Sequence, residues 1–366
     1  MNDIFELERR HSSGVYAKHE IAFVRGEGAR LWDQEGREYI DCMAGPGVAN
    51  LGHAHPTVLE AITVQARQLI TCPETYYNDR RAELMTKLGS LLPGAERVFL
   101  CNSGTEAIEA ALKFARVSTG RTKFIAAIGG FHGRTMGALS ATWNKRYREP
   151  FKPLVPGFEH VAYNNLTALE EAIDGETAAV ILEVVQGAGG VHIGERTFLE
   201  EAQRLCQESG ALLIIDEVQT GFGRTGKLLA VEHFGLNPDL LCLAKSIAGG
   251  LPMGAVLIGP RVENLAPGMH ATTFGGNVSL RGQPGCVRGD GNGELGRSSR
   301  QKGRSAAGST QGTSVADNQT GTWPRTDDRG RNQAKGGTLS AGHGRQGRDR
   351  AAGRHDGDSA ATTAGD

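Results

Sequence analysis

The chain has 366 residues, with 40 Lys and Arg against 41 Asp and Glu, and its formal net charge is -1. This length allows a large domain and a smaller one, and the balanced charge gives no sign of a nucleic-acid or membrane partner. No apolar run is long enough for a membrane span, and the start, MNDIFELERRHSSG, lacks the apolar core of a secretory signal. The six cysteines have no CxxC spacing, which favours free thiols in a reducing cytoplasm over disulfides or a zinc site.

The first part of the chain contains one hairpin signal and two helix signals. GARLWDQEGREYIDC predicts two short strands around the turn Asp33–Gly36. Amphipathic helices are predicted over HPTVLEAITVQARQLI and over RAELMTKLGSLLPG, where Pro93 and Gly94 end the second helix. We assign residues 1–50 to an N-terminal segment with a β-hairpin and residues 51–277 to a large domain.

Strand and helix patterns then alternate through that domain. Strands are predicted over RVFLCN, KFIAAIGG, TAAVILEVVQG, ALLIIDEVQTG, DLLCLAKSIAGG and MGAVLIGP, and helices over TEAIEAALKFARVSTG and RTFLEEAQRLCQESG. Apolar, β-branched runs joined by helical crossovers predict an α/β fold with a largely parallel sheet covered on both faces. Ligands of such sheets bind at the carboxyl ends of the strands.

The composition changes abruptly after Asn277. From Val278 to Asp366 the chain has no Phe, Ile, Tyr or Met, and Gly, Arg, Ser, Thr, Ala and Asp dominate. Such a segment cannot bury enough apolar surface to offset its ordering entropy, so residues 278–366 are predicted to be low-complexity and disordered. We favour a frameshift as its origin over a natural flexible tail, because plausible codons for Leu280–Cys286, read one base later from Arg281, encode Ala-Ala-Asn-Leu-Ala-Ala.

Two charged residues follow predicted buried strands. Lys245 lies between the run LLCLA and a pair of glycines, either as a solvated strand-end charge or as an amine held in a pocket. Asp216 directly follows four apolar residues, and a buried carboxylate needs a partner, either nearby backbone or a protonated ring nitrogen. One strand–loop–strand unit separates the two residues, which predicts that they end on neighbouring strand tips.

A possible anion site lies at the start of the helix in FLCNSGTEAIEAA. Ser103, Gly104 and Thr105 open this helix, whose first N–H groups and dipole favour an anion, and the two hydroxyls add donors. The alternative is an ordinary N-cap by Ser103 or Thr105, with Glu106 in the first turn. An amine, a carboxylate and a phosphate cradle together are what pyridoxal 5'-phosphate requires.

Two further motifs offer binding residues. In GGFHGRT, Phe131 could stack on a flat ring and Arg134 could clamp a carboxylate, although core packing and a surface charge are the simpler interpretations. In HATTFGGN, Thr272 and Thr273 precede a glycine pair and offer a further phosphate contact.

Two other motifs carry no site. GFGRTGK has the spacing of a phosphate loop, but Leu228 follows where Ser or Thr should bind magnesium. His53 and His55 have no ligand cluster nearby, and no metal is expected.

Together these motifs resemble the class III pyridoxal-phosphate aminotransferases of the ornithine and acetylornithine type. The resemblance covers Phe5–Asn277 and is carried, in family order and spacing, by NLGHAHP, CNSGTEAIEAALKFAR, GGFHGRT, IIDEVQTGFGRTGK, DLLCLAKSIAGGLPMGAV and TTFGGN. It implies fold type I, with a mostly parallel seven-stranded sheet in the large domain, a C-terminal small domain, and a homodimer that shares active sites across its interface.

The resemblance also implies a role for each candidate residue. Lys245 and Asp216 would be catalytic: Lys245 would hold the cofactor covalently and then move a proton, and Asp216 would hold the pyridinium. Arg134, Thr272 and Glu183 would contact the substrate. The cofactor-binding residues, with Thr273 reaching the phosphate in the partner subunit, would be Ser103, Gly104, Thr105, Phe131, His132, Asp216, Val218, Gln219, Lys245 and Thr273.

The implied reaction moves the terminal amine of N-acetylornithine to 2-oxoglutarate. A lysine-biosynthesis relative acting on a carrier-protein-linked substrate is a close alternative, and 4-aminobutyrate transfer and glutamate semialdehyde mutase are more distant ones. The hypothesis from another class is a non-catalytic, truncated remnant that at most dimerises.

Two departures from the family pattern affect that reaction. Ala188, in EVVQGAGG, replaces a glutamate that pairs with a small-domain arginine in ornithine-type members. The helix pattern expected after FGGN is absent, so the sequence predicts that the small domain is missing and that apolar surface of the large domain is exposed. We expect the chain as written to be poorly soluble or inactive.

Overall fold

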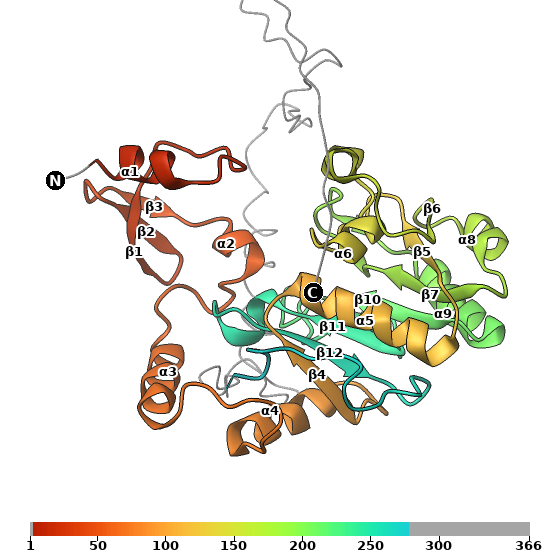
Figure 1. Ribbon diagram of the computed structural model, residues 1–366. Helices are drawn as coiled ribbons and strands as arrows, with labels where there is room; N and C mark the ends of the chain where they lie inside the picture. The colour runs from red at the N-terminus through yellow and green to blue at the C-terminus, as the bar shows by residue number, and fades with distance from the viewer. Residues whose placement is uncertain (1–2, 278–366) are drawn as a thin grey trace, which may run out of the picture. The chain divides into compact units, whose positions relative to one another are not determined.

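The computed structural model describes residues 3–277 and is built around one seven-stranded sheet (Figure 1). The strand order is β4-β12-β11-β10-β7-β5-β6, and every pairing is parallel except those of β12 with β11 and β4. The α/β class and the mostly parallel seven-stranded sheet are thereby confirmed. The strands are β4 (Arg97–Cys101), β5 (Lys123–Ala127), β6 (Phe158–Val161), β7 (Thr177–Leu182), β10 (Leu212–Asp216), β11 (Leu240–Leu243) and β12 (Gly254–Ile258).

Helices cover both faces of this sheet. Successive side chains of a strand point to opposite faces, and the core accordingly falls into two clusters: Ile214 packs with α5, whereas Ile215 packs with α9. Every residue of β7, β10, β11 and β12 is buried. One face carries α5 (Gly104–Thr119) and α6 (Met136–Ala141), and the other carries α4 (Asp79–Gly89), α8 (Leu166–Ala172) and α9 (Arg196–Ser209).

The N-terminal part forms a separate antiparallel sheet, with β1 (Phe23–Glu27), β2 (Arg30–Asp33) and β3 (Glu38–Ile40) in that order. The hairpin of β2 and β3 confirms the predicted turn. The buried carboxylate of Asp33 holds this turn, because it accepts the N–H groups of Glu35 and Arg37 and the hydroxyl of Tyr39. The domain boundaries at residues 50 and 277 stay predictions.

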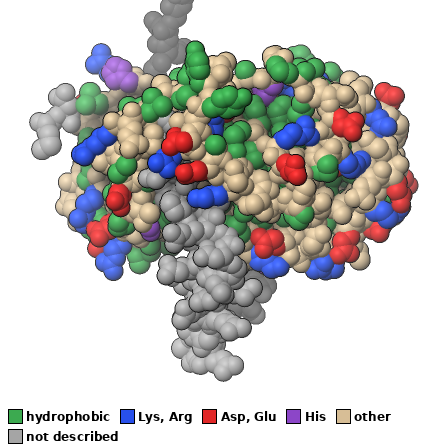
Figure 2. All heavy atoms as spheres, turned by 90° about the horizontal axis from the view of Figure 1, so that it is seen from below, with side chains coloured by type: hydrophobic (Ala, Val, Ile, Leu, Met, Phe, Trp, Pro, Cys, Tyr) green, Lys and Arg blue, Asp and Glu red, His purple; other side chains and the backbone are tan. Residues whose placement is uncertain are grey.

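The remaining elements of residues 3–277 are short or peripheral. They are α1 (Ile4–His11), α2 (Ala44–Gly47), α3 (Pro56–Gln68), α7 (Lys145–Arg148), η1 (Glu149–Phe151), β8 (Val185–Gln186), β9 (His192–Ile193), η2 (Ala230–His233) and η3 (Lys245–Ala248). Each helix of this part of the chain is too short or too polar to cross a membrane. On the face drawn in Figure 2, acidic and basic side chains are interspersed.

Four features differ from the sequence predictions. Helix α4 ends at Gly89, so Pro93 and Gly94 follow the helix and do not end it. The strand predicted over DLLCLAKSIAGG ends at Leu243, because Lys245 has a left-handed backbone with φ 48° and begins η3. The strand predicted over TAAVILEVVQG breaks into β7 and β8. The edge strand β6 was not predicted, since FEHV is short and half polar. The tail, whether disordered or frameshifted, and the missing small domain concern residues 278–366 and lie outside the described residues.

Candidate functional site

Asp216 and Lys245 end on neighbouring strand tips, as the sequence predicts. Asp216 is the last residue of β10 and pairs in register with Cys242 of the parallel strand β11. Lys245 begins η3, two residues beyond the end of β11. Parallel strands bring their carboxyl ends to the same edge of the sheet, so the acid and the amine lie in one electrostatic environment.

The side chain of Lys245 is not a solvated charge. Burial lowers the pKa of its amine, and the positive charge of Arg224 acts in the same direction, while the charges of Asp216 and Glu183 oppose them. The net effect is a pKa below the usual lysine range. An amine with these surroundings fits a pocket rather than a free strand end.

Both oxygens of the Asp216 carboxylate are engaged. Oδ1 accepts the N–H of Val218 at 2.9 Å, so the backbone partner that the sequence left open is present. Oδ2 lies 2.8 Å from Nδ1 of His132, which is buried. Burial alone would lower the pKa of His132, but the hydrogen bond to Asp216 and the charges of Asp216 and Glu183 together raise it. Nε2 of His132 has no hydrogen-bond partner within residues 3–277.

Glu183 adds a second buried carboxyl to this cluster. Its Oε1 accepts the N–H of Phe131 at 2.9 Å. Burial raises the pKa of Glu183 to about 7; Asp216 adds to this rise, and His132, the Phe131 N–H and Lys245 oppose it. His132, Glu183, Asp216 and Lys245 therefore form one group of interacting charges at the ends of β5, β7, β10 and β11.

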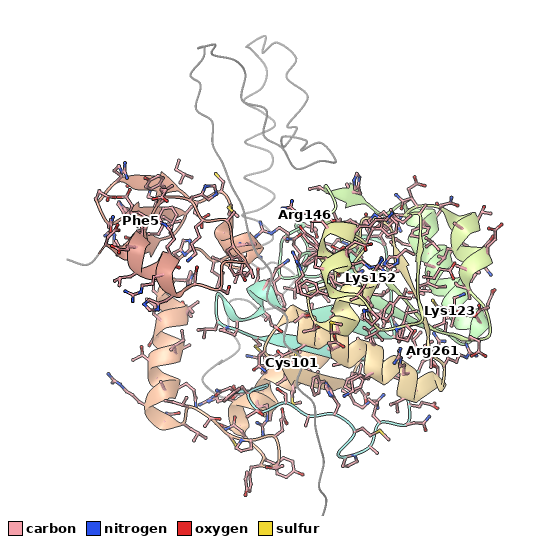
Figure 3. All side chains as sticks on the ribbon, turned by 45° about the horizontal axis from the view of Figure 1, so that its top comes forward. Phe5, Cys101, Lys123, Arg146, Lys152 and Arg261 are labelled. Carbon is pink, nitrogen blue, oxygen red and sulfur yellow. The ribbon has the colours of Figure 1, made fainter. Side chains whose placement is uncertain are left out.

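The start of α5 follows Cys101, the last residue of β4, which is labelled in Figure 3. Ser103 is the N-cap, because its Oγ accepts the N–H of Glu106 at 3.3 Å, and this confirms the N-cap interpretation. The N–H groups of Gly104 and Thr105 donate to no atom of the described residues. These first-turn donors therefore stay free for an anion, which is compatible with the cap.

Gly104 brings the start of α5 against the two strand tips. A Cβ at this position would lie 2.6 Å from Cγ1 of Val218 and 3.4 Å from Cβ of Ala244. Val218 follows Asp216 closely, and Ala244 immediately precedes Lys245. The structure thus brings together the amine, the carboxylate and the free helix N–H groups that the sequence predicts to be close.

Phe131 and Arg134 meet a residue that sequence reasoning missed. The Arg134 guanidinium carbon lies 3.6 Å from the ring centroid of Tyr147 and 5.7 Å from that of Phe131. Phe131 and Tyr147 contact edge to face at 6.0 Å. Arg134 is exposed, and its guanidinium lies over two aromatic rings. Tyr147 lies in the charged stretch KRYR, which carries no sequence signal for a site.

The two threonines of HATTFGGN lie beside the loop before α5. Oγ1 of Thr272 accepts from Nδ2 of Asn102 at 3.3 Å and from the N–H of Gly275 at 3.0 Å. Thr272 and the exposed Thr273 line a cavity of about 330 Å³, together with Glu106 and Glu109. The hydroxyl of Thr105 bonds instead to Thr135, at 2.7 Å.

Gln219 lies against the loop that carries Ala188. A Cβ on Gly187 would fall 1.6 Å from Oε1 of Gln219, so only glycine allows this contact. Ala188 itself is exposed. The backbone at Gly187 and the side chain of Gln219 are therefore in close contact.

Comparison with known proteins decides the family. Residues 13–280 match the family described as class-III aminotransferases. The chain belongs to this family. The expectation that its motifs raised is confirmed, and the chain is an aminotransferase by family. Members of the family depend on pyridoxal phosphate and act on an amino donor and a keto acid.

Several relatives of this aminotransferase are known. The acetylornithine aminotransferase of Methanopyrus kandleri is 53% identical over 277 residues, which are 75% of this chain and 71% of that protein. The LysW-aminoadipate semialdehyde transaminase of Deinococcus radiodurans is also 53% identical, over 74% of this chain and 64% of its own length. The solved ornithine aminotransferase of Toxoplasma gondii, with partial occupancy of PLP at its active site, is 35% identical, with a TM-score of 0.73 over 82% of this chain and 71% of that one.

The residues of this aminotransferase fit the family cofactor. Lys245 is a half-buried amine with a lowered pKa, and the buried carboxylate of Asp216 lies on the neighbouring strand tip. Two unpartnered N–H groups open α5, where Gly104 leaves no room for a side chain. Amine, carboxylate and anion donors are the three groups that pyridoxal phosphate needs.

Proposed function

We propose that this aminotransferase moves the terminal amino group of N-acetylornithine to 2-oxoglutarate, with pyridoxal 5'-phosphate as cofactor. The observation that carries the proposal is the meeting of Lys245, Asp216 and the free N–H groups of α5 at one edge of the sheet. When bound, the cofactor supplies an electron sink for the carbon that gives up its proton.

Different residues are proposed to bind different parts of the cofactor. The N–H groups of Gly104 and Thr105 bind its phosphate, with the helix dipole in favour of the negative charge. The Asp216 carboxylate, oriented by Val218 and His132, would hold the protonated ring nitrogen. Phe131 would stack on the flat ring, with Val218 and Gln219 beside it. Thr273 would reach the phosphate in the partner subunit of a homodimer.

Lys245 is the proposed base of the reaction. Because its pKa lies below the usual lysine range, a larger fraction of the amine is neutral near neutral pH. A neutral Nζ can accept the proton from the donor carbon and return it at the neighbouring acceptor carbon.

Arg134, Thr272 and Glu183 are proposed to recognise the substrates. The guanidinium of Arg134, held over Tyr147, is placed to bind a carboxylate.

Exposed apolar side chains before α4, among them Ile70, Tyr76 and Tyr77, support a second copy of this chain as partner. The five cysteines of residues 3–277 are all free, which supports a cytoplasmic location.

A lysine-biosynthesis reaction on a carrier-protein-linked substrate is the second candidate. The Deinococcus radiodurans relative supports it with the same 53% identity as the acetylornithine enzyme. The remaining alternative is a non-catalytic remnant.

One experiment separates these three functions. The purified chain is loaded with pyridoxal phosphate and reduced with borohydride, and its peptides are mapped by mass spectrometry. We expect the adduct on Lys245. Glutamate formation from N-acetylornithine and 2-oxoglutarate would support the proposed reaction and would contradict the expectation from the sequence that the chain as written is inactive. Turnover of the carrier-linked donor alone would favour the second candidate, whereas no adduct and no turnover would leave the remnant. An adduct on another lysine would overturn the site.

A further inference from the structure

Residues 41–53 connect the small N-terminal sheet to α3 and contact both loops of the site. Oγ of Ser246, the residue after Lys245, donates to the carbonyl of Gly47 at 3.0 Å. Nδ2 of Asn50 donates to the carbonyl of Phe222 at 3.0 Å, and the Arg224 guanidinium donates to Oδ1 of Asn50. One segment therefore bonds to the loop that begins at Lys245 and to the loop that follows Asp216.

This segment is anchored at both of its ends. Oδ1 of Asp41 accepts the N–H groups of Met43 and Ala44, both at 2.9 Å, and Oδ2 lies 2.7 Å from Nε2 of His53. The backbones of His53 and Gly28 exchange hydrogen bonds of 2.8 and 2.9 Å. Asp41 is therefore the side-chain partner of His53. The backbone bonds of His53 to Gly28 fix the segment to the small N-terminal sheet.

The turn that begins at Lys245 has a backbone conformation that contacts from other parts of the chain must stabilise. Its φ of 48° is a left-handed conformation that non-glycine residues adopt only where surrounding contacts impose it. Inside the turn, the N–H of Ile247 bonds to the carbonyl of Ala244 at 3.1 Å. From outside, the side-chain bond of the buried Ser246 to Gly47 fixes the turn against residues distant in sequence.

The same segment places a cation beside the amine. Arg224 is exposed, and its bond to Asn50 directs the guanidinium toward Gly47, whose Cβ position lies 3.9 Å from Nη2. Charged groups that act on Lys245 are Asp216, Glu183 and Arg224. Asn50 therefore positions the Arg224 guanidinium, whose charge lowers the pKa of Lys245.

We propose that residues 41–53 act as a clasp, in which Asn50 and Ser246 are positioning residues that hold the Lys245 amine in the site. Neither side chain needs to touch substrate or cofactor for this role. The inference rests on the proposed function for its catalytic meaning, but the clasp itself exists in the protein without cofactor.

The test measures the titration of Lys245 in the full cofactor-free chain. Trace acetic anhydride labels each amine in proportion to its neutral fraction, and mass spectrometry follows the labelling from neutral to alkaline pH. Exposed Lys152, labelled in Figure 3, is the internal reference. We expect Lys245 to titrate below Lys152 in the unmodified protein. In Ser246→Ala and Asn50→Ala the titration should shift upward toward Lys152, because burial and Arg224 both lower the Lys245 pKa.

Matched variants show whether the effect is specific. Ser246→Thr keeps the hydroxyl, so Lys245 should still titrate at a lower pH than Lys152. Ser90→Ala removes a similar hydroxyl bond, to the carbonyl of Lys87 at 2.8 Å, outside the clasp and should change nothing. An unchanged Lys245 titration in both clasp variants would overturn the proposal, as would a Lys245 that titrates with Lys152 in the unmodified protein.

Hydrogen exchange of the unmodified chain keeps the proposal testable even if an alanine variant fails to fold. The backbone amides of residues 41–53, 217–224 and 244–251 should exchange at a common rate, because the three segments should open in one step. Rapid opening of 41–53 while the two loops stay protected would contradict the clasp. Absence of a cofactor adduct on Lys245 would reject the proposed function alone, because titration and exchange are measured without cofactor.

Discussion

His132 Nδ1 lies 2.8 Å from Asp216 Oδ2, and the two side chains are 0% and 5% exposed. The imidazole is therefore the side-chain partner of the carboxylate that we assign to the cofactor ring. A contact of this kind determines both where the carboxylate points and how well its charge is tolerated in the core.

Replacement of His132 by alanine should destabilise the protein and weaken cofactor binding. Removing one partner of a buried pair leaves the other charge uncompensated, at a cost of about 3–5 kcal/mol. Urea unfolding measures the loss, and a cofactor titration followed by absorbance measures the affinity. His160→Ala is the control, because that half-buried imidazole hydrogen-bonds the carbonyl of Ala141 and has no hydrogen bond to Asp216. Equal effects of both variants would contradict a special role for His132.

Glu217 should make the stability of the fold depend on pH. Its buried carboxylate accepts the N–H groups of Ala230 and Val231 at 2.8 and 2.7 Å, and burial raises its pKa from 4.5 to about 7. A raised carboxyl pKa stabilises the fold fully below 4.5, and this contribution is lost as the pH rises through 7. The shift corresponds to about 3 kcal/mol.

Glu217→Gln imitates the protonated side chain and should therefore flatten this part of the stability curve between pH 4.5 and 7. The free energy of unfolding, measured in urea at several pH values, checks the expectation. The exposed Glu170→Gln should leave the curve as it is. A pH slope that persists in Glu217→Gln would show that other groups cause it.

Gly104→Ala should displace the start of α5. Its Cβ would lie 2.6 Å from Val218, far inside van der Waals contact, so the helix or the loop after Asp216 must move. Overpacking of this kind costs about 1–3 kcal/mol, and we expect a larger relative loss in pyridoxal-phosphate affinity, because the donors move with the helix. Gly175→Ala is the matched control, since no atom lies within 4 Å of its Cβ position. Unchanged cofactor affinity in Gly104→Ala would argue against a phosphate site here.

Tyr147→Leu should release Arg134 and lower the affinity for a carboxylate donor. An exposed cation–π contact is worth about 0.5–1 kcal/mol, which corresponds to a loss of about two- to fivefold in binding. Titration calorimetry with N-acetylornithine on the cofactor-loaded chain measures it. Tyr147→Phe keeps the ring and should bind as the unmodified chain does. Equal losses in both variants would point to the hydroxyl rather than to the ring.

The elements best predicted from the sequence are the strands that are buried on both faces of the sheet. Long apolar runs predicted β7, β10, β11 and β12, because strands buried on both faces need them. The placement of Asp216 and Lys245 followed from the same runs. The edge strand β6 escaped, since FEHV has one exposed and two half-buried residues and carries no such run.

The unpredicted parts of the site depend on contacts between residues distant in sequence. Tyr147 lies in a charged helical turn, and only the fold places its ring under Arg134. The bond of Ser246 to Gly47 joins residues 199 positions apart, and neither residue has a local pattern that announces it. Local periodicity predicts elements, whereas the pairing of their loops is determined by tertiary packing.

The reversed direction of β12 has a consequence for how the chain folds during synthesis. In the seven-stranded sheet, β4 has β12 as its sole neighbour. The first strand of this sheet to leave the ribosome is therefore the last that can be joined to it, since residues 254–258 must emerge first. Until then β4, which leads into the start of α5, cannot pair with the sheet, so the last strand pairing beside the binding site is a late step of high contact order.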